Sequence, residues 1–137
     1  MKYSLDTNTC IRFLNGRSEG VRRKLPTVPT QDIIVCSIVR GELAYGAAKS
    51  QTPAKSAAKQ QKFLKPYSTL PYDDAAAAEF GRIRASLEAA GTPIGPYDIQ
   101  IAAIALIHGL TVVTHNAREF ERVTGLQIED WEVTQPE

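Results

Sequence analysis

The stretch MKYSLDTNTC (residues 1–10) opens the chain and decides how the fold begins. Apolar and polar residues alternate over residues 2–6, which predicts a short strand. The strand ends directly at the carboxylate Asp6, and residues 8–15 then predict a short helix. Asp6 can act as the cap of that helix. It can instead belong to a metal site, which would need further carboxylates from distant parts of the chain.

Length and composition indicate one globular domain. The chain has 137 residues, of which 43% are hydrophobic, and no apolar run approaches the roughly 18 residues that a membrane helix needs. We expect a single domain over residues 1–132 with a C-terminal tail at 133–137. No signal segment is recognisable, so a cytoplasmic protein without a membrane partner is expected. Cys10 and Cys36 show no metal-ligand spacing and are expected to be reduced, half-buried thiols.

The charge of the chain is unevenly distributed along its length. Residues 1–66 hold 12 Lys or Arg and 4 Asp or Glu, a net charge of +8, whereas residues 67–137 hold 4 and 11, a net charge of −7. Such asymmetry is typical of a face that binds a polyanion. The alternative is that the two halves attract each other within a compact fold.

Predicted strands alternate with predicted helices along the chain. Helices are expected over residues 8–15, 18–25, 37–49, 51–67 (opening near Pro53 and closing before Pro66), 73–90 and 97–108. Ser18, Ser37 and either Asp73 or Asp74 are the candidate caps of their helices. Strands are expected over 2–6, 32–36, 68–72, 110–114 and 126–131, with 68–72 weakened by Pro71. This alternation favours an α/β sandwich with a mostly parallel sheet. Ligands bind such sheets beyond the carboxyl ends of the strands, where Asp6 and residues 114–116 are expected to lie.

Two further acids interrupt apolar helices. Glu42 lies inside the apolar stripe of its predicted helix, where a lone charge is costly unless it is paired or bound to a metal. Its alternative is a position at the edge of the stripe, reaching water or an arginine. Asp98 stands in the first turn of the most apolar helix, where it can also serve the helix dipole alone.

Acids from distant segments that meet at one sheet edge would repel each other, and a hard cation would relieve that repulsion. Because no His or Cys accompanies them, Mg²⁺ or Mn²⁺ is favoured over zinc. The chemistry that fits is hydrolysis of a phosphodiester bond by an activated water. A water nucleophile would leave a 5′-phosphate and a 3′-hydroxyl.

Several motifs, in this order and spacing, resemble one family. They are LDTN (5–8), ELAYGAAKS (42–50), GTPIGPYDIQIAAIA (91–105), GLTVVTHNAREFERVTGL (109–126) and EDW (129–131). Together they resemble the PIN-domain ribonucleases of the VapC toxin family, and the resemblance covers nearly the whole chain. It implies a PIN-like three-layer α/β/α sandwich with a five-stranded, mostly parallel sheet.

The resemblance also implies an activity and partners. Members are Mg²⁺- or Mn²⁺-dependent endoribonucleases of type II toxin–antitoxin systems, which cut structured RNA such as a tRNA or rRNA loop. A cognate antitoxin protein inhibits them, and they commonly form homodimers. We therefore expect an RNA substrate, an antitoxin partner and a homodimer.

Residue by residue, the resemblance implies that Asp6, Glu42 and Asp98 are catalytic and hold the metal. Thr114 matches a hydroxyl position that orients Asp6 or a water. Asn116 falls at the fourth acidic position of the family, which is a departure from its pattern, and Glu119 can supply the missing charge.

Two other functions remain open at this stage. A phosphatase with Asp6 as nucleophile would need an acid two residues later, where Asn8 stands. A non-catalytic module of the same fold would bind RNA or a partner chain through the basic half. Of the two histidines, His108 suits a helix C-terminus, and His115 stands at a strand end from which it can reach a substrate.

Overall fold

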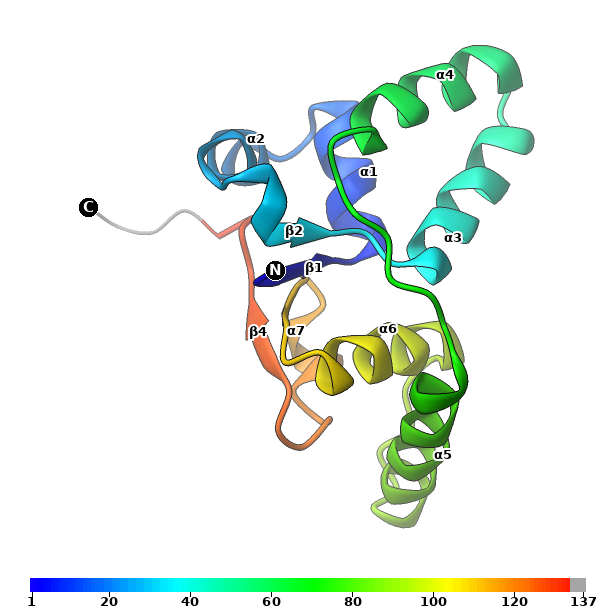
Figure 1. The fold of residues 1–137 in the computed structure, drawn as a ribbon, viewed down its shortest axis with the longest axis vertical. Helices are drawn as coiled ribbons and strands as arrows, with labels where there is room; N and C mark the ends of the chain where they lie inside the picture. Colours follow the sequence, from blue (N-terminus) through cyan, green and yellow to red (C-terminus); the bar gives the residue numbers. More distant parts are fainter. Residues whose placement is uncertain (134–137) are drawn as a thin grey trace.

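Four parallel strands form the sheet at the centre of the computed structural model, which describes residues 1–133 (Figure 1). The strands are β1 (Tyr3–Leu5), β2 (Ile33–Ile34), β3 (Thr111–Val113) and β4 (Gln127–Glu129). Their order is β2-β1-β3-β4, and every pair is parallel. All four strands therefore end at the same edge of the sheet.

Helices lie on both sides of this sheet, with α1 to α4 above the strands and α5 and α6 below them in the view of Figure 1. The helices are α1 (Thr7–Asn15), α2 (Glu19–Lys24), α3 (Ser37–Ala48), α4 (Pro53–Leu64), α5 (Asp74–Ala89), α6 (Pro96–Ile107) and α7 (Ala117–Phe120), with short 3₁₀ turns η1 (Leu25–Thr27) and η2 (Thr30–Asp32). The predicted three-layer α/β/α fold is confirmed. The helix expected to open near Pro53 and close before Pro66 is confirmed as α4, which runs from Pro53 to Leu64.

The predicted fifth strand is wrong as a full strand. Residues 68–72 contribute only an isolated parallel bridge between Ser68 and Ile34. The amides of Val35 and Ser37 still donate to the carbonyls of Ser68 and Leu70, at 3.0 Å each. Pro71 has no amide hydrogen to donate, so a regular ladder cannot continue along this segment. Ser37, expected as a helix cap, instead accepts a hydrogen bond from the amide of Tyr72 at 3.2 Å.

Helix α6 lies in the core, as its uniformly apolar sequence predicted. Its buried side chains are Ile99, Ile101, Ala102, Ala103, Ile104 and Ala105. Burying each isoleucine contributes roughly 1.5–3 kcal/mol, so α6 is a main source of stability for the domain. No helix of the described residues is long and apolar enough to span a membrane.

Both cysteines are free, as expected, but they are fully buried and not half-buried. Cys10 lies in α1 and Cys36 immediately precedes α3, so both face the core that these helices share with the sheet. The predicted boundary between the domain at 1–132 and the tail stays a prediction, because residues 134–137 lie outside the described residues.

The segment after β4 packs directly against α2 through Gly20. A Cβ at this position would lie 2.3 Å from the carbonyl oxygen of Trp131 and 3.0 Å from that of Glu132. Both obstacles are backbone atoms, which cannot rotate away as a flexible side chain can. Glycine is therefore required here by the close approach of two chain segments.

We expect Gly20→Ala to lower the free energy of unfolding by about 1–3 kcal/mol, as overpacking does in a fixed backbone environment. Gly81→Ala is the matched control, since it lies exposed in α5 and its added Cβ meets nothing within 4 Å. That change should raise stability by about 0.5–1 kcal/mol. Urea denaturation of both variants measures the difference, and equal stability of the two would contradict the close packing.

Candidate active site

Asp6 lies where β1 ends and α1 begins, and it serves both functions that the sequence left open. Its Oδ1 accepts a hydrogen bond from the amide of Thr9 at 2.8 Å, which caps α1. Its own amide donates to the carbonyl of Val113 at 3.1 Å, which ties it to the end of β3. The side chain is 4% exposed. Burial raises the pKa of Asp6, and the hydroxyls of Thr114 and Thr9 counteract part of that rise.

Glu42 projects from α3 toward the start of α1. The hydroxyl of Thr7 donates to its Oε1 at 2.6 Å, so this half-buried carboxylate is held by a neutral group and not by an arginine. Glu42 also lines a cavity of about 260 Å³ between α1, α3 and α4, together with Lys59. Sequence reasoning did not identify Thr7 as a partner of Glu42. The feature of the sequence that could have indicated this role is that Thr7 directly follows Asp6.

Asp98 lies in the first turn of α6 but does not cap that helix, whose N-cap Gly95 has no side-chain hydrogen bond. The pKa of Asp98 is raised to about 6, mainly by burial and in smaller part by the negative charges of Asp6, Glu42 and Glu119. The charges of acids from three other segments therefore reach Asp98. Asp98 is therefore not the cap of α6, and its role as a site residue stays a prediction.

The segment after β3 supplies the last part of this site. Thr114 is fully buried, and its Oγ1 accepts a hydrogen bond from the amide of Asn116 at 2.9 Å. The side chain of Asn116 donates to Oε2 of Glu119 at 3.1 Å. Asn116, which falls at the fourth acidic position of the family, is therefore hydrogen-bonded to an acid one helical turn later.

No cation holds the acids of this site. Among the described residues, no ion pair within 4.0 Å involves Asp6, Glu42, Asp98 or Glu119. A threonine hydroxyl, a backbone amide and a side-chain amide orient Glu42, Asp6 and Glu119, respectively, without cancelling their charge. A site with uncompensated negative charge and only oxygen donors suits a hard divalent cation such as Mg²⁺ or Mn²⁺.

The residues do not form a closed metal cage as they stand. Within residues 1–133, no three His, Cys, Asp or Glu side chains lie close enough to share an ion. The other acids are near enough to contribute to the raised pKa of Asp98, but they are too far apart to surround one ion directly. This arrangement fits a magnesium site, since Mg²⁺ keeps several waters and takes only one or two protein carboxylates directly.

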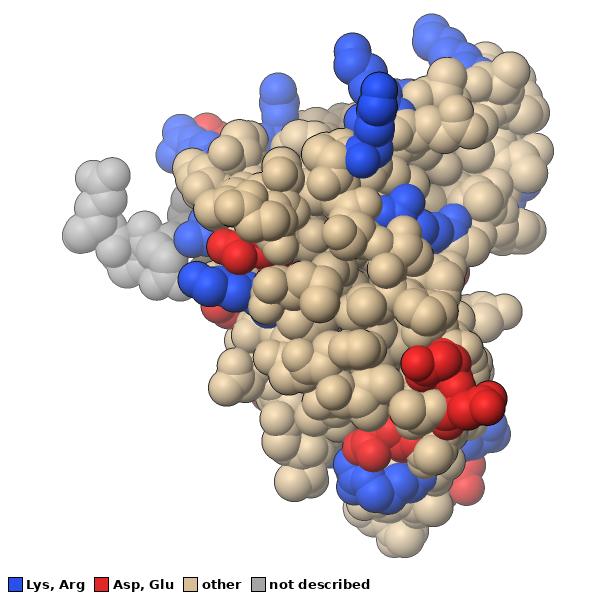
Figure 2. All heavy atoms as spheres, in the orientation of Figure 1, with Lys and Arg blue, Asp and Glu red and all other residues tan. Residues whose placement is uncertain are grey.

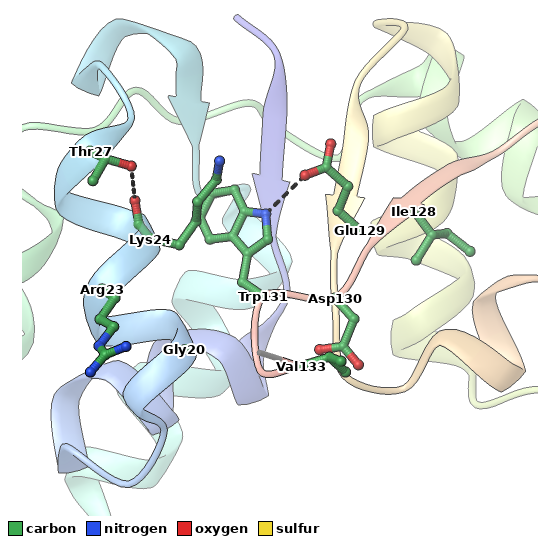
Figure 3. Close-up of a pocket in the computed structure, with 9 residues that line it drawn as sticks. All are labelled: Gly20, Arg23, Lys24, Thr27, Ile128, Glu129, Asp130, Trp131 and Val133. Carbon is green, nitrogen blue, oxygen red and sulfur yellow. Dashed lines mark hydrogen bonds between the residues drawn. The ribbon is translucent and has the colours of Figure 1, made fainter. Parts of the chain in front are cut away.

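A larger cavity, of about 740 Å³, is lined by none of the four acids of this site. Figure 3 shows it between α2 and the segment after β4, with Arg23 and Lys24 on one wall and Glu129 and Asp130 on the other. The indole of Trp131 donates to Oε1 of Glu129 at 3.0 Å and is nearly buried. Trp131 is therefore part of the packed interior, as the tyrosine contact at its ring edge also indicates.

A family model described as the PIN domain matches residues 3–126. The chain is 45% identical over 131 residues to the tRNA(fMet)-specific endonuclease VapC of Salmonella typhimurium, which covers 96% of this chain and 98% of the relative. This chain belongs to the PIN-domain ribonucleases of the VapC toxin family. The predicted family and the predicted ribonuclease class are confirmed.

Other VapC relatives agree along the same length. Ribonuclease VapC2 of Haemophilus influenzae (strain ATCC 51907 / DSM 11121 / KW20 / Rd) is 40% identical over 131 residues, covering 96% of this chain and 98% of that protein. The crystal structure of DNA-bound VapBC from Salmonella typhimurium matches with a TM-score of 0.90 at 45% identity, covering 96% of this chain and 98% of that one. VapBC2 of Rickettsia felis, bound to a promoter DNA fragment, matches with a TM-score of 0.88 at 32% identity, covering 96% and 99%.

The raised pKa of Asp98 predicts how stability depends on pH in the absence of metal. The pKa is about 6 in the folded chain against an ordinary value of 3.8. Between these values the folded state holds a proton that the unfolded state has lost, so stability falls as pH rises through this interval. In EDTA at pH 7, Asp98→Asn should therefore have a higher thermal midpoint than the wild type, and the two should converge at pH below 4.

Thermal denaturation across this pH range measures the effect. Asp74→Asn is the control, since it removes an exposed acid from the first turn of α5 and should not raise the midpoint. Parallel pH profiles for the wild type and Asp98→Asn would contradict the mutual repulsion of the acids.

Proposed function

We propose that this chain is the toxin of a type II toxin–antitoxin pair and that it hydrolyses phosphodiester bonds in a structured RNA with Mg²⁺ or Mn²⁺. One observation carries the proposal. The charges of Asp6, Glu42 and Glu119 converge on Asp98 at the carboxyl edge of a parallel sheet, and no described cation compensates them. A phosphatase with Asp6 as nucleophile is not supported, because Asp6 is buried and its Oδ1 caps a helix.

Each residue has a defined task in this proposal. Asp6, Glu42 and Asp98 provide the oxygen ligands, and Thr7 and the amide of Thr9 fix the orientation of the first two. Asn116 holds Glu119 within reach of Asp98. When bound, Mg²⁺ or Mn²⁺ would neutralise phosphate charge and lower the pKa of an attacking water. Since water is the nucleophile, the products carry 5′-phosphate and 3′-hydroxyl ends.

The distribution of exposed charge supports an RNA substrate. Figure 2 shows mostly basic side chains over the half of the molecule that contains α1 to α4, and acidic side chains mixed with basic ones near α5. Of the ion pairs in the described residues, only Arg12–Glu132, at 3.7 Å, joins the basic half of the sequence to the acidic half. The two halves therefore do not neutralise each other by contact. Exposed cations on α2, and on or directly after α4, are Arg22, Arg23 (which pairs with Glu19 at 2.7 Å), Lys24, Lys55, Lys59, Lys62 and Lys65.

The substrate we favour is an initiator tRNA. The relatives from Salmonella typhimurium and Shigella flexneri, at 45% and 43% identity, are both named tRNA(fMet)-specific endonucleases. The basic residues near the site can neutralise the phosphates of a folded RNA. A tRNA substrate also places the activity in the cytoplasm. Cleavage of an rRNA loop is the other outcome that the experiment below distinguishes.

The partner we infer is a cognate antitoxin protein, since the matching structures from Salmonella typhimurium and Rickettsia felis are VapBC complexes. An antitoxin that inhibits the enzyme would cover the acidic site or its surroundings. The expected homodimer stays a prediction, which size-exclusion chromatography of the purified chain tests directly.

Purified protein incubated with total RNA and Mg²⁺ or Mn²⁺ should produce new 5′-phosphate ends within tRNA, and EDTA should abolish them. Asp98→Asn should reduce the rate by about 100-fold or more, since several kcal/mol of charge stabilisation are lost. It should remain folded, because Asp98 caps no helix. Asp6→Ala prepared in parallel controls for contaminating nucleases. Products with 2′,3′-cyclic phosphates, or full activity of Glu42→Ala, would contradict the mechanism.

Glu119 is the acid whose role needs separate proof. We expect Glu119→Gln to raise the metal concentration for half-maximal activity by about tenfold, as loss of a residue supporting a metal site does. Glu121→Gln is the matched control, because it removes an exposed acid two residues later in the same segment. Identical metal titrations for the two variants would show that Asn116 alone fills the fourth position.

A further inference from the structure

His115 stands at the catalytic edge of the sheet, between two residues of the candidate site. Thr114 before it contacts Asp6, and Asn116 after it holds Glu119. Its Nδ1 lies 2.9 Å from Oδ2 of Asp130, which follows β4. The imidazole therefore bridges the segments that follow β3 and β4, at the same edge of the sheet as Asp6.

Asp130 is itself held in place. Its Oδ1 accepts a hydrogen bond from the amide of Glu132 at 2.9 Å, so one carboxylate oxygen is fixed by the backbone and the other by His115. Figure 3 shows the Asp130 carboxylate pointing away from the Trp131 indole, which occupies the interior side of this segment. The side chain of Asp130 is 20% exposed, whereas that of His115 is 56% exposed. The exposed ring of His115 is thus held by the largely buried carboxylate of Asp130.

This support determines which nitrogen of the ring faces a ligand. A carboxylate accepts hydrogen bonds and cannot donate them, so Nδ1 of His115 carries the hydrogen that Asp130 accepts. Nε2 is then the atom of the ring available to a ligand. It has no hydrogen-bond partner in the described part of the chain.

If the hydrogen bond between His115 and Asp130 served only to join two strand ends, the imidazole would not need to be exposed. Such a contact contributes more to stability when its side chains are buried, whereas exposed ion pairs contribute little. The position of His115 directly after β3, at the sheet edge that holds Asp6, gives the ring a different use. If the scissile phosphate of an RNA lies over Asp6 and Asp98, the neighbouring nucleotides lie along the same carboxyl edge of the sheet.

We propose that Nε2 of His115, oriented by Asp130, contacts the sugar–phosphate backbone of the RNA beside the scissile bond. The inference rests on the proposed function, because it needs an RNA bound at the acidic edge. The group recognised is a ribose 2′-hydroxyl or a phosphate oxygen of a nucleotide next to the cleaved one. His115 is a substrate-binding residue in this proposal, and it takes no part in binding the metal.

The decisive variants separate the substrate contact from the tie to Asp130. In His115→Asn the amide nitrogen takes the place of Nδ1 and can still donate to Asp130, but nothing replaces Nε2. His115→Ala loses both interactions. We expect both variants to raise KM for the mapped RNA by about tenfold, the effect of one lost hydrogen bond to a charged or well-placed partner, with kcat changed by less than about threefold.

Two readouts besides turnover check the result. RNA affinity measured in the inactive Asp98→Asn background should fall by about tenfold when either His115 change is added. The thermal midpoint and the metal titration should stay unchanged for His115→Asn. His108→Ala is the matched control, since this exposed histidine follows α6 at the opposite end of β3 and should leave KM and affinity unaltered.

Modified substrates identify the contacted group. A single 2′-deoxy or methylphosphonate substitution beside the cleavage site should weaken wild-type binding, and the substitution at the contacted group should have no further effect in His115→Ala. If neither substitution couples to His115, or if His115→Asn binds RNA as tightly as the wild type, the proposal is wrong. Wild-type protein that neither binds nor cleaves RNA would instead refute the proposed function.

Discussion

The structure depends on the parallel pairing of β1 between β2 and β3. Because all strands run in one direction, the chain leaves β1 and β3 at the same edge, and the amide of Asp6 bonds to the carbonyl of Val113 there. Helices α3 and α6 bring Glu42 and Asp98 to this edge from the two sides of the sheet. Without this register, each acid would be an ordinary cap or surface charge.

The way in which the acids are held is as informative as their position. An arginine beside Asp98 or Glu42 would lower the repulsion and remove the need for a metal ion. The chain instead uses Thr7, the amide of Thr9, Thr114 and Asn116, all of them neutral. Hydrogen bonds of this kind fix geometry and leave charge in place. Burial, together with the charge left on the other acids, raises the pKa of Asp98, and a site in this state is prepared for a divalent cation.

Predictions from the sequence succeeded where local chemistry or a long periodic pattern decides the outcome. Ser18 and Asp73 cap their helices, and the apolar segment at 97–108 lies in the core as α6. Prediction failed where tertiary contacts compete with local preference. Because of Pro71, residues 68–72 form only one bridge to β2. The hydroxyl of Ser37 accepts a hydrogen bond from the amide of Tyr72 and does not cap its own helix.

The sequence by itself determined the alternating strands and helices, the acids at 6, 42 and 98, and the family to which their order belongs. These features follow from short-range pattern and residue type, which a chain carries before it folds. Only the tertiary structure decided that Thr7 serves Glu42, that Asn116 holds Glu119, and that His115 rests on Asp130. The partners in the first and last of these pairs lie 35 and 15 residues apart, and only the packing of the folded chain determines which side chains meet across such separations.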